Sequence, residues 1–161
     1  MKYNTLPTEK VIKKTIDALE SNGIHSIFVK NVEYAKQKVL EMLPTGAEVM
    51  IMSSVTLEKI GISQEIQDSN NYVSIKKKLM ALDRKTQNSE MQKLGSAPMW
   101  AIGSVHAVTE DGHVLIASNT GSQLPAYAYG AEHVIWVVGA QKILKNTEEG
   151  LKRIYEHSLP L

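Results

Sequence analysis

Two stretches near the N-terminus carry apolar residues at helical spacing. The first begins after Thr8, a residue type suited to cap a helix, and ends at the Asn22-Gly23 pair. Its apolar face comprises Val11, Ile12, Ile16 and Leu19. The second begins after Asn31, ends at the turn formed by residues 44–46, and has an apolar face made of Ala35, Val39, Met42 and Leu43. The pattern therefore predicts two amphipathic helices.

Short apolar runs alternate with these helical patterns and predict strands. They are "IHSIFV" at 24–29, "AEVMIM" at 47–52 and "VIWVV" at 134–138. The last run is apolar on both faces, which is typical of a central strand buried on both sides. The polar residues 53–95 predict helical pieces around 57–60, 73–82 and 89–94, and Thr147 opens a C-terminal helix. This alternation favours the α/β class, with a mostly parallel, mixed sheet covered by helices on both faces.

One antiparallel hairpin is predicted around "TEDG" at 109–112, because Asp-Gly between apolar runs is a strong signal for a two-residue turn. We expect this hairpin, residues 100–117, to join the same sheet. A two-residue turn pairs Glu110 with His113, and counting outward pairs Val108 with Leu115, His106 with Ala117, and Ser104 with Asn119. Because directly opposed residues share a face, this register places Ser104, His106 and Asn119 on one surface.

The length of 161 residues, with 43% hydrophobic and 22% charged residues, fits one globular domain, which we predict over residues 1–161. The formal net charge is +1 with no long run of one sign, so neither nucleic acid nor a membrane is an expected partner. The "KKK" cluster at 76–78 fits the solvated face of a helix. The apolar stretches are too short to cross a bilayer and "MKYNTLPTEK" lacks a signal-peptide pattern, which predicts a cytoplasmic protein.

Cysteine is absent, which excludes disulfides, thiolate nucleophiles, zinc-thiolate sites and cysteine-ligated iron–sulfur clusters. The glycine-rich nucleotide motifs and the HExxH zinc motif are also missing. The spacing typical of metal ligands is not found among His25, His113, His133 and His157. The sequence therefore predicts neither a metal nor a cofactor on this chain.

Six small or amide residues, "SNTGSQ" at 118–123, follow a predicted strand and precede a helix start. Backbone N–H groups in such a loop point outward and favour an anion, and Gly121 would let a ligand approach the backbone closely. The ordinary alternative is that Asn119 or Thr120 caps the following helix, with Pro125 tolerated in its first turn. Because capping needs only one such residue, the run favours a ligand loop formed by Asn119, Thr120, Gly121, Ser122 and Gln123.

A second loop, "SSVT" at 53–56, shows the same pattern directly after the 47–52 strand. Ser53, Ser54 and Thr56 offer hydroxyls and amides to a ligand, or alternatively cap a helix that begins at Leu57. Since ligands of open α/β sheets bind beyond the strand ends, we predict that the two loops converge on one pocket for a small anion. Ser104 and His106 would form the wall of that pocket.

His106 is the titratable candidate on that predicted surface. A histidine ring can act as an acid, a base or a hydrogen-bond donor near neutral pH, or it can be a satisfied wall residue. Glu110 and Asp111 lie in the predicted turn, where contact with water would make them poor general bases. Lys142 follows the last predicted strand, where it either reaches an anion or lies in solvent at a helix entry. No catalytic residue is therefore assigned.

Three segments together resemble the LUD domain, a family of LutC-like lactate-utilization proteins: "SVTLEKIGI", "GSVHAVTEDGHVLIASNTG" and "HVIWVVGAQKILKNTEEGLKRI". Relatives carry "SxTLxExG", "NAITEDG", a glycine-rich loop and "VVGxNKIVxDxxxAxxRI". The resemblance covers nearly the whole chain and implies the NagB/RpiA/CoA-transferase-like fold. There are two departures from the family pattern. His106 stands where many relatives have asparagine, and the relatives' "GNR" loop is here "TGSQ".

The resemblance implies an association with the oxidation of lactate to pyruvate. Some relatives continue into a cysteine-rich tail that this sequence lacks, so the expected partners are redox subunits that carry the cofactors. The first hypothesis is an accessory protein that binds a small anion or organic acid. The alternative is an enzyme of the related isomerase or transferase class, acting on a sugar phosphate or CoA thioester, although a CoA transferase needs a buried carboxylate nucleophile that the sequence does not nominate. A third is a regulatory or scaffold domain that uses a sheet edge as an interface. A homo-oligomer is also among the expected assemblies.

Overall fold

The computed structural model describes residues 3–160, and the chain forms two compact units. The large unit consists of residues 29–104 and 118–137, and the small unit consists of residues 3–28, 105–117 and 138–160. Each unit has its own sheet, and each is described by itself below. The single domain over residues 1–161 stays a prediction. Among residues 3–160, no helix combines the length and the apolar character that a membrane span requires.

The sheet of the large unit has four parallel strands in the order β2 (Val73–Ser74), β1 (Glu48–Ile51), β3 (Trp100–Gly103) and β6 (His133–Trp136). Its parallel pairing confirms the α/β class and the strands predicted within 47–52 and 134–138. The prediction that 134–138 is a central strand is wrong, because β6 lies at the edge of this sheet and Val134 is 37% exposed. An apolar run alone does not give the position of a strand in the sheet order.

The register of the central strands aligns their carboxyl ends. Ile51 of β1 lies opposite Ile102 of β3, and Gly103 of β3 lies opposite Trp136 of β6. Two backbone hydrogen bonds continue the alignment past the strand ends, from Met52 N–H to the Ile102 oxygen at 2.8 Å and from Val137 N–H to the Gly103 oxygen at 2.9 Å. The residues that follow β1 and β3 therefore emerge along one edge of the sheet.

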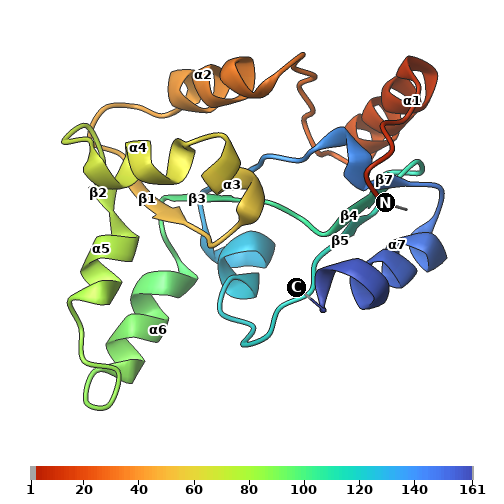
Figure 1. Cartoon of the computed structure of the whole chain (residues 1–161). Coiled ribbons are helices and arrows are strands. Elements are labelled where there is room, and N and C mark those ends of the chain that lie inside the picture. Colours follow the sequence, from red (N-terminus) through yellow and green to blue (C-terminus); the bar gives the residue numbers. More distant parts are fainter. Residues whose placement is uncertain (1–2, 161) are drawn as a thin grey trace. The chain divides into compact units, whose positions relative to one another are not determined.

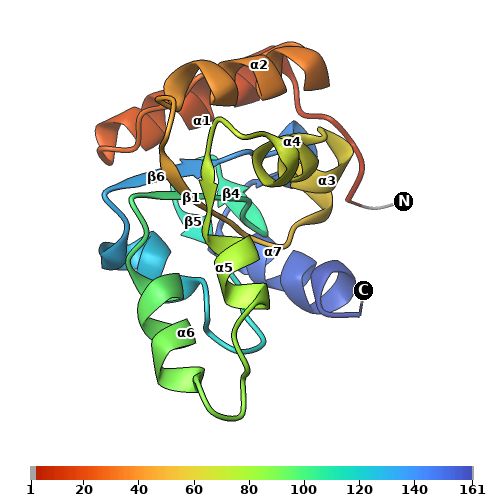
Figure 2. The same cartoon turned by 90° about the vertical axis from the view of Figure 1, so that its left-hand side faces the viewer.

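Five α-helices and a π-helical turn complete the large unit: α2 (Val32–Met42), α3 (Val55–Lys59), α4 (Ile62–Asp68), α5 (Ile75–Met80), α6 (Asn88–Ser96) and η1 (Ala126–Gly130). In Figures 1 and 2, α2 lies on one side of β1 and β3, and α5 and α6 lie on the other. The Asn31 side chain caps α2 as predicted, by accepting a hydrogen bond from the Tyr34 N–H at 3.0 Å. The predicted helical pieces within 53–95 correspond to α3, α5 and α6, whereas α4 was not predicted.

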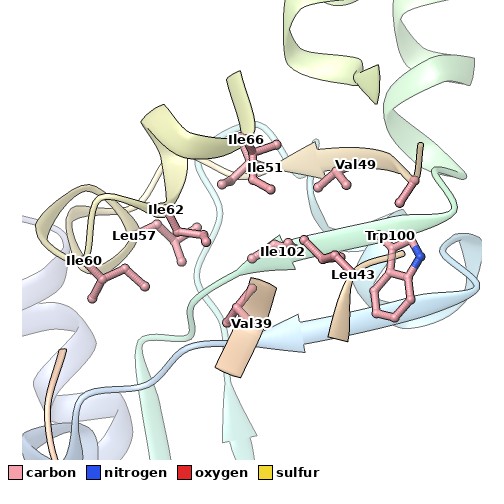
Figure 3. Close-up of a cluster of buried hydrophobic side chains, with 11 residues drawn as sticks. Val39, Leu43, Val49, Ile51, Leu57, Ile60, Ile62, Ile66, Trp100 and Ile102 are labelled. Atoms are coloured by element: carbon pink, nitrogen blue, oxygen red, sulfur yellow. The ribbon is translucent and has the colours of Figure 1, made fainter. Parts of the chain in front are cut away.

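Apolar side chains cover both faces of the large sheet. Figure 3 shows the larger cluster, in which Val39 of α2 and Leu43, directly after that helix, pack with Ile51 of β1 and Ile102 of β3. Leu57 of α3, Ile60 directly after it, and Ile62 and Ile66 of α4 belong to the same cluster. A second cluster on the opposite face contains Met52, Ala101 and Ala126. A parallel sheet buried on both faces is the arrangement that the βαβ pattern predicts.

The small unit has a three-stranded mixed sheet in the order β5 (Val114–Leu115), β4 (Ala107–Thr109) and β7 (Ile143–Leu144). Its helices are α1 (Glu9–Ser21) and α7 (Thr147–Arg153), with a 3-10 turn η2 (Ala140–Lys142) and a π-helical turn η3 (Ile154–Ser158). The predicted N-terminal and C-terminal helices are confirmed. Thr8 caps α1 as expected, and Asn146 caps α7 by accepting a hydrogen bond from the Glu149 N–H at 3.0 Å.

The strand predicted at 24–29 is wrong, because these residues have no regular secondary structure. The Glu20 carboxylate accepts a hydrogen bond from the Ser26 backbone N–H at 2.5 Å and also lies 3.1 Å from the His25 ring. A side chain that takes up a backbone donor competes with the pairing that a strand needs. Ile27 and Phe28 are 46% and 56% exposed, so this apolar run is not a buried segment.

The predicted hairpin register is also wrong. The turn between β4 and β5 has three residues, because Thr109 N–H donates to the His113 oxygen at 2.9 Å and Gly112 adopts a left-handed φ of 85°. Ala107 therefore lies opposite Leu115, and Val108 opposite Val114, instead of the predicted Val108 with Leu115. A shift of one residue reverses the faces of a strand.

The hairpin does not join the large sheet either. Residues 104–106 separate β3 from β4, and these two strands belong to different sheets. The β4–β5 ladder ends at Ala107 and Leu115, so the predicted pair of Ser104 with Asn119 is not formed. The segment between β3 and β4 is a change of sheet, which a hydrophobic pattern does not reveal.

Candidate functional site

Hydroxyl groups meet where β1 and β3 end. Ser104 directly follows β3, and its Oγ lies 3.5 Å from Oγ1 of Thr56, in the first turn of α3. Both residues are half-buried. The sequence placed Thr56 and Ser104 in one site, and the structure brings them together although 48 positions separate them in the chain.

The other two residues of the 53–56 loop have different surroundings. The Ser54 side chain accepts a hydrogen bond from the Thr56 N–H at 3.2 Å and caps α3, as the capping alternative predicted. Ser53 is exposed. Ser54 therefore stabilises the start of α3. Ligand contact by Ser53 and Ser54 stays a prediction.

Tyr127 adds a phenol at the end of β3. It comes from η1, and its hydroxyl lies so close over Gly103 that a Cβ atom built there would be 1.5 Å from the phenol oxygen. Burial raises the pKa of Tyr127 to about 12, opposed by a hydrogen bond from the Ser104 backbone. The phenol is therefore neutral at pH 7 and can donate or accept a hydrogen bond. We refer to Thr56, Ser104 and Tyr127 as the hydroxyl cluster.

Trp136 supports Tyr127 from the neighbouring strand. The two rings are perpendicular, with an interplanar angle of 90° and centroids 5.6 Å apart. Trp136 lies opposite Gly103 in the β3–β6 ladder, so the missing side chain of Gly103 leaves the space for the phenol. Tyr127 was not among the site residues predicted from the sequence. Its signal was the glycine at the end of a strand, which marks a close approach of another group.

The 118–123 loop is closed by its own hydrogen bonds. The Ser118 hydroxyl accepts from the Gly121 N–H at 2.8 Å and donates to the Gln123 side-chain oxygen at 2.7 Å. Thr120 and Ser122 share a hydroxyl–hydroxyl contact of 3.0 Å, and both are exposed, as is Asn119. Ser118 was not among the predicted site residues. The convergence of Asn119, Thr120, Gly121, Ser122 and Gln123 with the 53–56 loop stays a prediction.

The helix that this loop precedes begins at Leu124, near Gln123 as predicted, and Pro125 lies in its first turn. It continues as η1, a π-helical turn, and neither Asn119 nor Thr120 caps η1. A π-helical turn often marks a functional position, because its wider spacing reorients a side chain. In this case it carries Tyr127 over Gly103.

His106 lies in the small unit, so its predicted place beside the two loops stays a prediction. Its Nδ1 accepts a hydrogen bond from the Ala117 N–H at 3.2 Å. Burial lowers the pKa of His106 below its ordinary value, and the positive charges of Lys142 and Arg153 lower it further. The ring is therefore neutral at pH 7.

Two further predictions about side chains need correction. Lys142 is not a solvated helix-entry residue, because it is half-buried and its Nζ donates to the Val105 oxygen at 2.9 Å. Burial, followed by the charge of Arg153, lowers the pKa of Lys142 to about 8. Glu110 is not in open water, because its side chain is 21% exposed and pairs with Lys14 at 2.9 Å. Asp111 is exposed as predicted.

Metal ligands do not gather in the part of the chain that the structure describes. Among residues 3–160, no group of three or more histidine, cysteine, aspartate or glutamate side chains could hold a metal ion. The chemistry at the ends of β1 and β3 is instead that of neutral hydroxyls, which donate and accept hydrogen bonds.

Gly103→Ala is expected to lower the free energy of unfolding by about 1 to 2 kcal/mol, because the new methyl group would displace the buried Tyr127 ring. Urea unfolding would measure the loss. In a Tyr127→Phe background the loss should be smaller, because the nearest atom, at 1.5 Å, is then gone. An equal loss in both backgrounds would show that Tyr127 does not occupy this space.

Comparison with known proteins identifies the family of the chain but no individual relative. The chain matched no curated protein and no solved structure. The NagB/RpiA/CoA-transferase-like fold therefore stays a prediction of the resemblance. The family model of the LUD domain matches residues 12–160, which is nearly the whole chain. The chain belongs to the LUD domain family.

Proposed function

We propose that this protein is an accessory protein of lactate utilization that binds a small organic acid, while partner subunits carry the redox cofactors. Membership of the LUD domain family makes a role in lactate utilization plausible. The observation that carries the binding proposal is the hydroxyl cluster, in which Thr56 and Ser104 lie 3.5 Å apart at the carboxyl ends of parallel strands. Ligands of α/β proteins bind at this end of the sheet.

The chemistry of the cluster suits a hydroxy acid or a keto acid. Thr56, Ser104 and Tyr127 each carry a hydroxyl that can donate to a carboxylate oxygen or accept from a ligand hydroxyl. Each neutral hydrogen bond of this kind contributes about 0.5 to 1.5 kcal/mol. Since the cluster consists of neutral hydroxyls, it supports binding and orientation better than covalent catalysis, which needs an activated nucleophile.

Thr56→Val should weaken the binding of lactate or pyruvate by about three- to tenfold, because it removes one hydroxyl and keeps the volume of the side chain. Calorimetric titration of the whole chain with each acid would measure the dissociation constants. Thr45→Val is the matched control, because Thr45 is exposed in a turn of the same unit. Sulfate and a sugar phosphate, titrated in parallel, would separate organic acids from other anions.

The 118–123 loop needs a different substitution. Gly121 has a φ of 73°, a conformation in which a bulky residue such as valine would strain the backbone even without a ligand. Gly121→Asn is therefore the better probe, because asparagine tolerates this conformation. Gly46→Asn is its control, since Gly46 has a φ of 82° and neither glycine has an atom within 4 Å of an added Cβ. Weaker binding in Gly121→Asn alone would place the ligand at this loop.

Two results would contradict the proposal. One is that neither lactate nor pyruvate binds the parent protein at millimolar concentration. The other is that Thr56→Val and Gly121→Asn bind as tightly as their controls, in which case neither loop contacts the ligand.

A further inference from the structure

Arg153 is a buried cation that forms no direct ion pair with a carboxylate within residues 3–160. Its side chain belongs to the last residue of α7 and is 4% exposed. One terminal nitrogen donates to the His106 backbone oxygen at 2.5 Å and to the Ser158 hydroxyl at 3.0 Å. Its Nε is buried and has no hydrogen-bond partner among the described residues. An arginine stays charged in a protein, so burying it without a counter-charge is unfavourable.

Lys142 and His106 bring two more basic groups to the same segment of the small unit. The Lys142 Nζ donates to the Val105 oxygen, one residue before the carbonyl that Arg153 contacts. The charges act on one another, because Arg153 lowers the pKa of Lys142, and both lower the pKa of His106. We refer to His106, Lys142 and Arg153 as the basic cluster.

One ring nitrogen of His106, Nδ1, is occupied by a hydrogen bond. Because Nδ1 accepts the Ala117 N–H, the neutral ring carries its proton on Nε2. Nε2 is then a donor at pH 7 and stays one on protonation, whereas the added proton occupies Nδ1 and removes the hydrogen bond from Ala117. The side chain is half-buried, which keeps water from fully screening its interactions.

The π-helical turn η3 explains how Arg153 is positioned. The Leu159 N–H donates to the Ile154 oxygen at 2.9 Å, five residues back, which widens the helix directly after Arg153. The Ser158 hydroxyl thereby reaches the guanidinium. The Tyr3 ring lies against Arg153, with its centroid 5.9 Å from the guanidinium carbon. The ring and the oxygens of His106 and Ser158 that contact Arg153 are neutral, and the Tyr3 hydroxyl itself donates to the Glu156 carboxylate at 2.5 Å.

We propose that His106, Lys142 and Arg153 form an oxyanion site in the small unit, which accepts a carboxylate or a phosphate group. Charge-assisted hydrogen bonds to an oxyanion are about twice as strong as neutral ones, and a guanidinium matches the geometry of both groups. The site shares no residue with the hydroxyl cluster, and it goes beyond the proposed function because it does not depend on binding there.

A purely structural role makes a different prediction. If Lys142 and Arg153 only tie the 105–106 backbone to α7 and η2, their removal lowers stability whether or not an anion is present. If they hold an anion, their removal abolishes a response that the anion produces. The His106 ring reports that response directly, because a bound anion raises the pKa of a neighbouring histidine.

The experiment is an NMR titration of the histidine rings in the full-length protein. The His106 signal is assigned by its loss in His106→Gln, and the pKa is measured with phosphate or acetate against chloride at equal ionic strength. We expect phosphate or acetate to raise the His106 pKa by about 0.5 to 1 in a saturable manner. The anion that acts at the lower concentration identifies the class of ligand.

Variants then test the cluster. Lys142→Met and Arg153→Met should weaken the apparent affinity for the anion by about tenfold. Lys152→Met is the control, because Lys152 is an exposed neighbour of Arg153 on α7 that pairs with Glu148 at 2.8 Å. Thr56→Val should leave the His106 titration unchanged, so failure of the hydroxyl cluster and failure of the basic cluster are distinguishable.

The parent protein alone can overturn the proposal, even if Arg153→Met does not fold. A His106 pKa that is the same in phosphate, acetate and chloride would exclude the oxyanion site. So would an anion effect of equal size in Lys142→Met and the parent, which would leave Lys142 and Arg153 as structural ties.

Discussion

Gly130→Ala is expected to lower the free energy of unfolding by about 3 kcal/mol. Gly130 ends η1, and a Cβ atom there would lie 1.8 Å from the backbone oxygen of Ser96, the last residue of α6. The Ser96 carbonyl carbon and the Pro125 oxygen would be 2.9 and 3.2 Å away. Because these atoms belong to backbone, no side-chain rotation relieves the overlap, and η1 must move away from α6.

Urea unfolding followed by circular dichroism measures this loss, with Gly95→Ala as the control. Gly95 lies within α6, where the nearest atom to an added Cβ is Leu79 Cδ1 at 4.0 Å. Alanine should therefore raise stability at Gly95 by about 0.5 to 1 kcal/mol, because it favours the helix without a clash. A Gly130→Ala protein as stable as the parent would show that η1 does not pack against α6 at this distance.

Gly112→Ala is expected to cost about 3 kcal/mol, from two separate causes. The residue has a φ of 85°, a conformation that alanine adopts with strain. In addition, an added Cβ would lie 2.8 Å from the Ala18 carbonyl oxygen in α1 and 2.7 Å from the Asn22 amide nitrogen. That amide donates to the Gly112 oxygen at 3.2 Å, so the substitution also disturbs the contact between the hairpin and α1.

Gly23→Ala separates the two causes. Gly23 has a φ of 78°, but no atom lies within 4 Å of an added Cβ, so only the backbone strain of about 1 kcal/mol is expected there. The difference between the two losses of stability, both from urea unfolding, gives the cost of packing against α1. Equal losses would mean that the hairpin turn does not rest on this helix.

The elements that the sequence predicted correctly are those whose signals are local. Thr8 and Asn31 cap α1 and α2 as expected, because a capping side chain contacts a backbone group only three positions away. The parallel pairing of β1 and β3 follows from the helices between them, since a parallel connection needs a crossover. These features depend on spacing within a short segment.

The features that the sequence did not predict depend on groups distant in the chain or on one extra residue. The β4–β5 register shifted because the turn has three residues, and an Asp-Gly pair occurs in turns of both lengths. The 24–29 run looks like a strand, yet Glu20 takes the Ser26 amide. The edge position of β6 depends on the strand order, which a continuous apolar run does not encode.

The candidate site shows the same limit. Thr56 and Ser104 were predicted because each directly follows a strand, and strand ends of a parallel sheet meet at one edge. Tyr127 and Arg153 were not, because each is placed through a π-helical turn, η1 and η3 respectively, and the hydrophobic pattern of a π turn resembles that of an α-helix. Burial of the arginine charge was invisible for the same reason.

The interleaving of the two units along the chain has a consequence for synthesis. All residues of the large unit precede position 138, whereas β7 and α7 of the small unit come after it. The chain therefore contains every segment of the large sheet before it contains β7, the strand that pairs with β4. We expect a chain that stops at residue 137 to keep the parallel sheet and to leave the hairpin and α1 exposed to proteases.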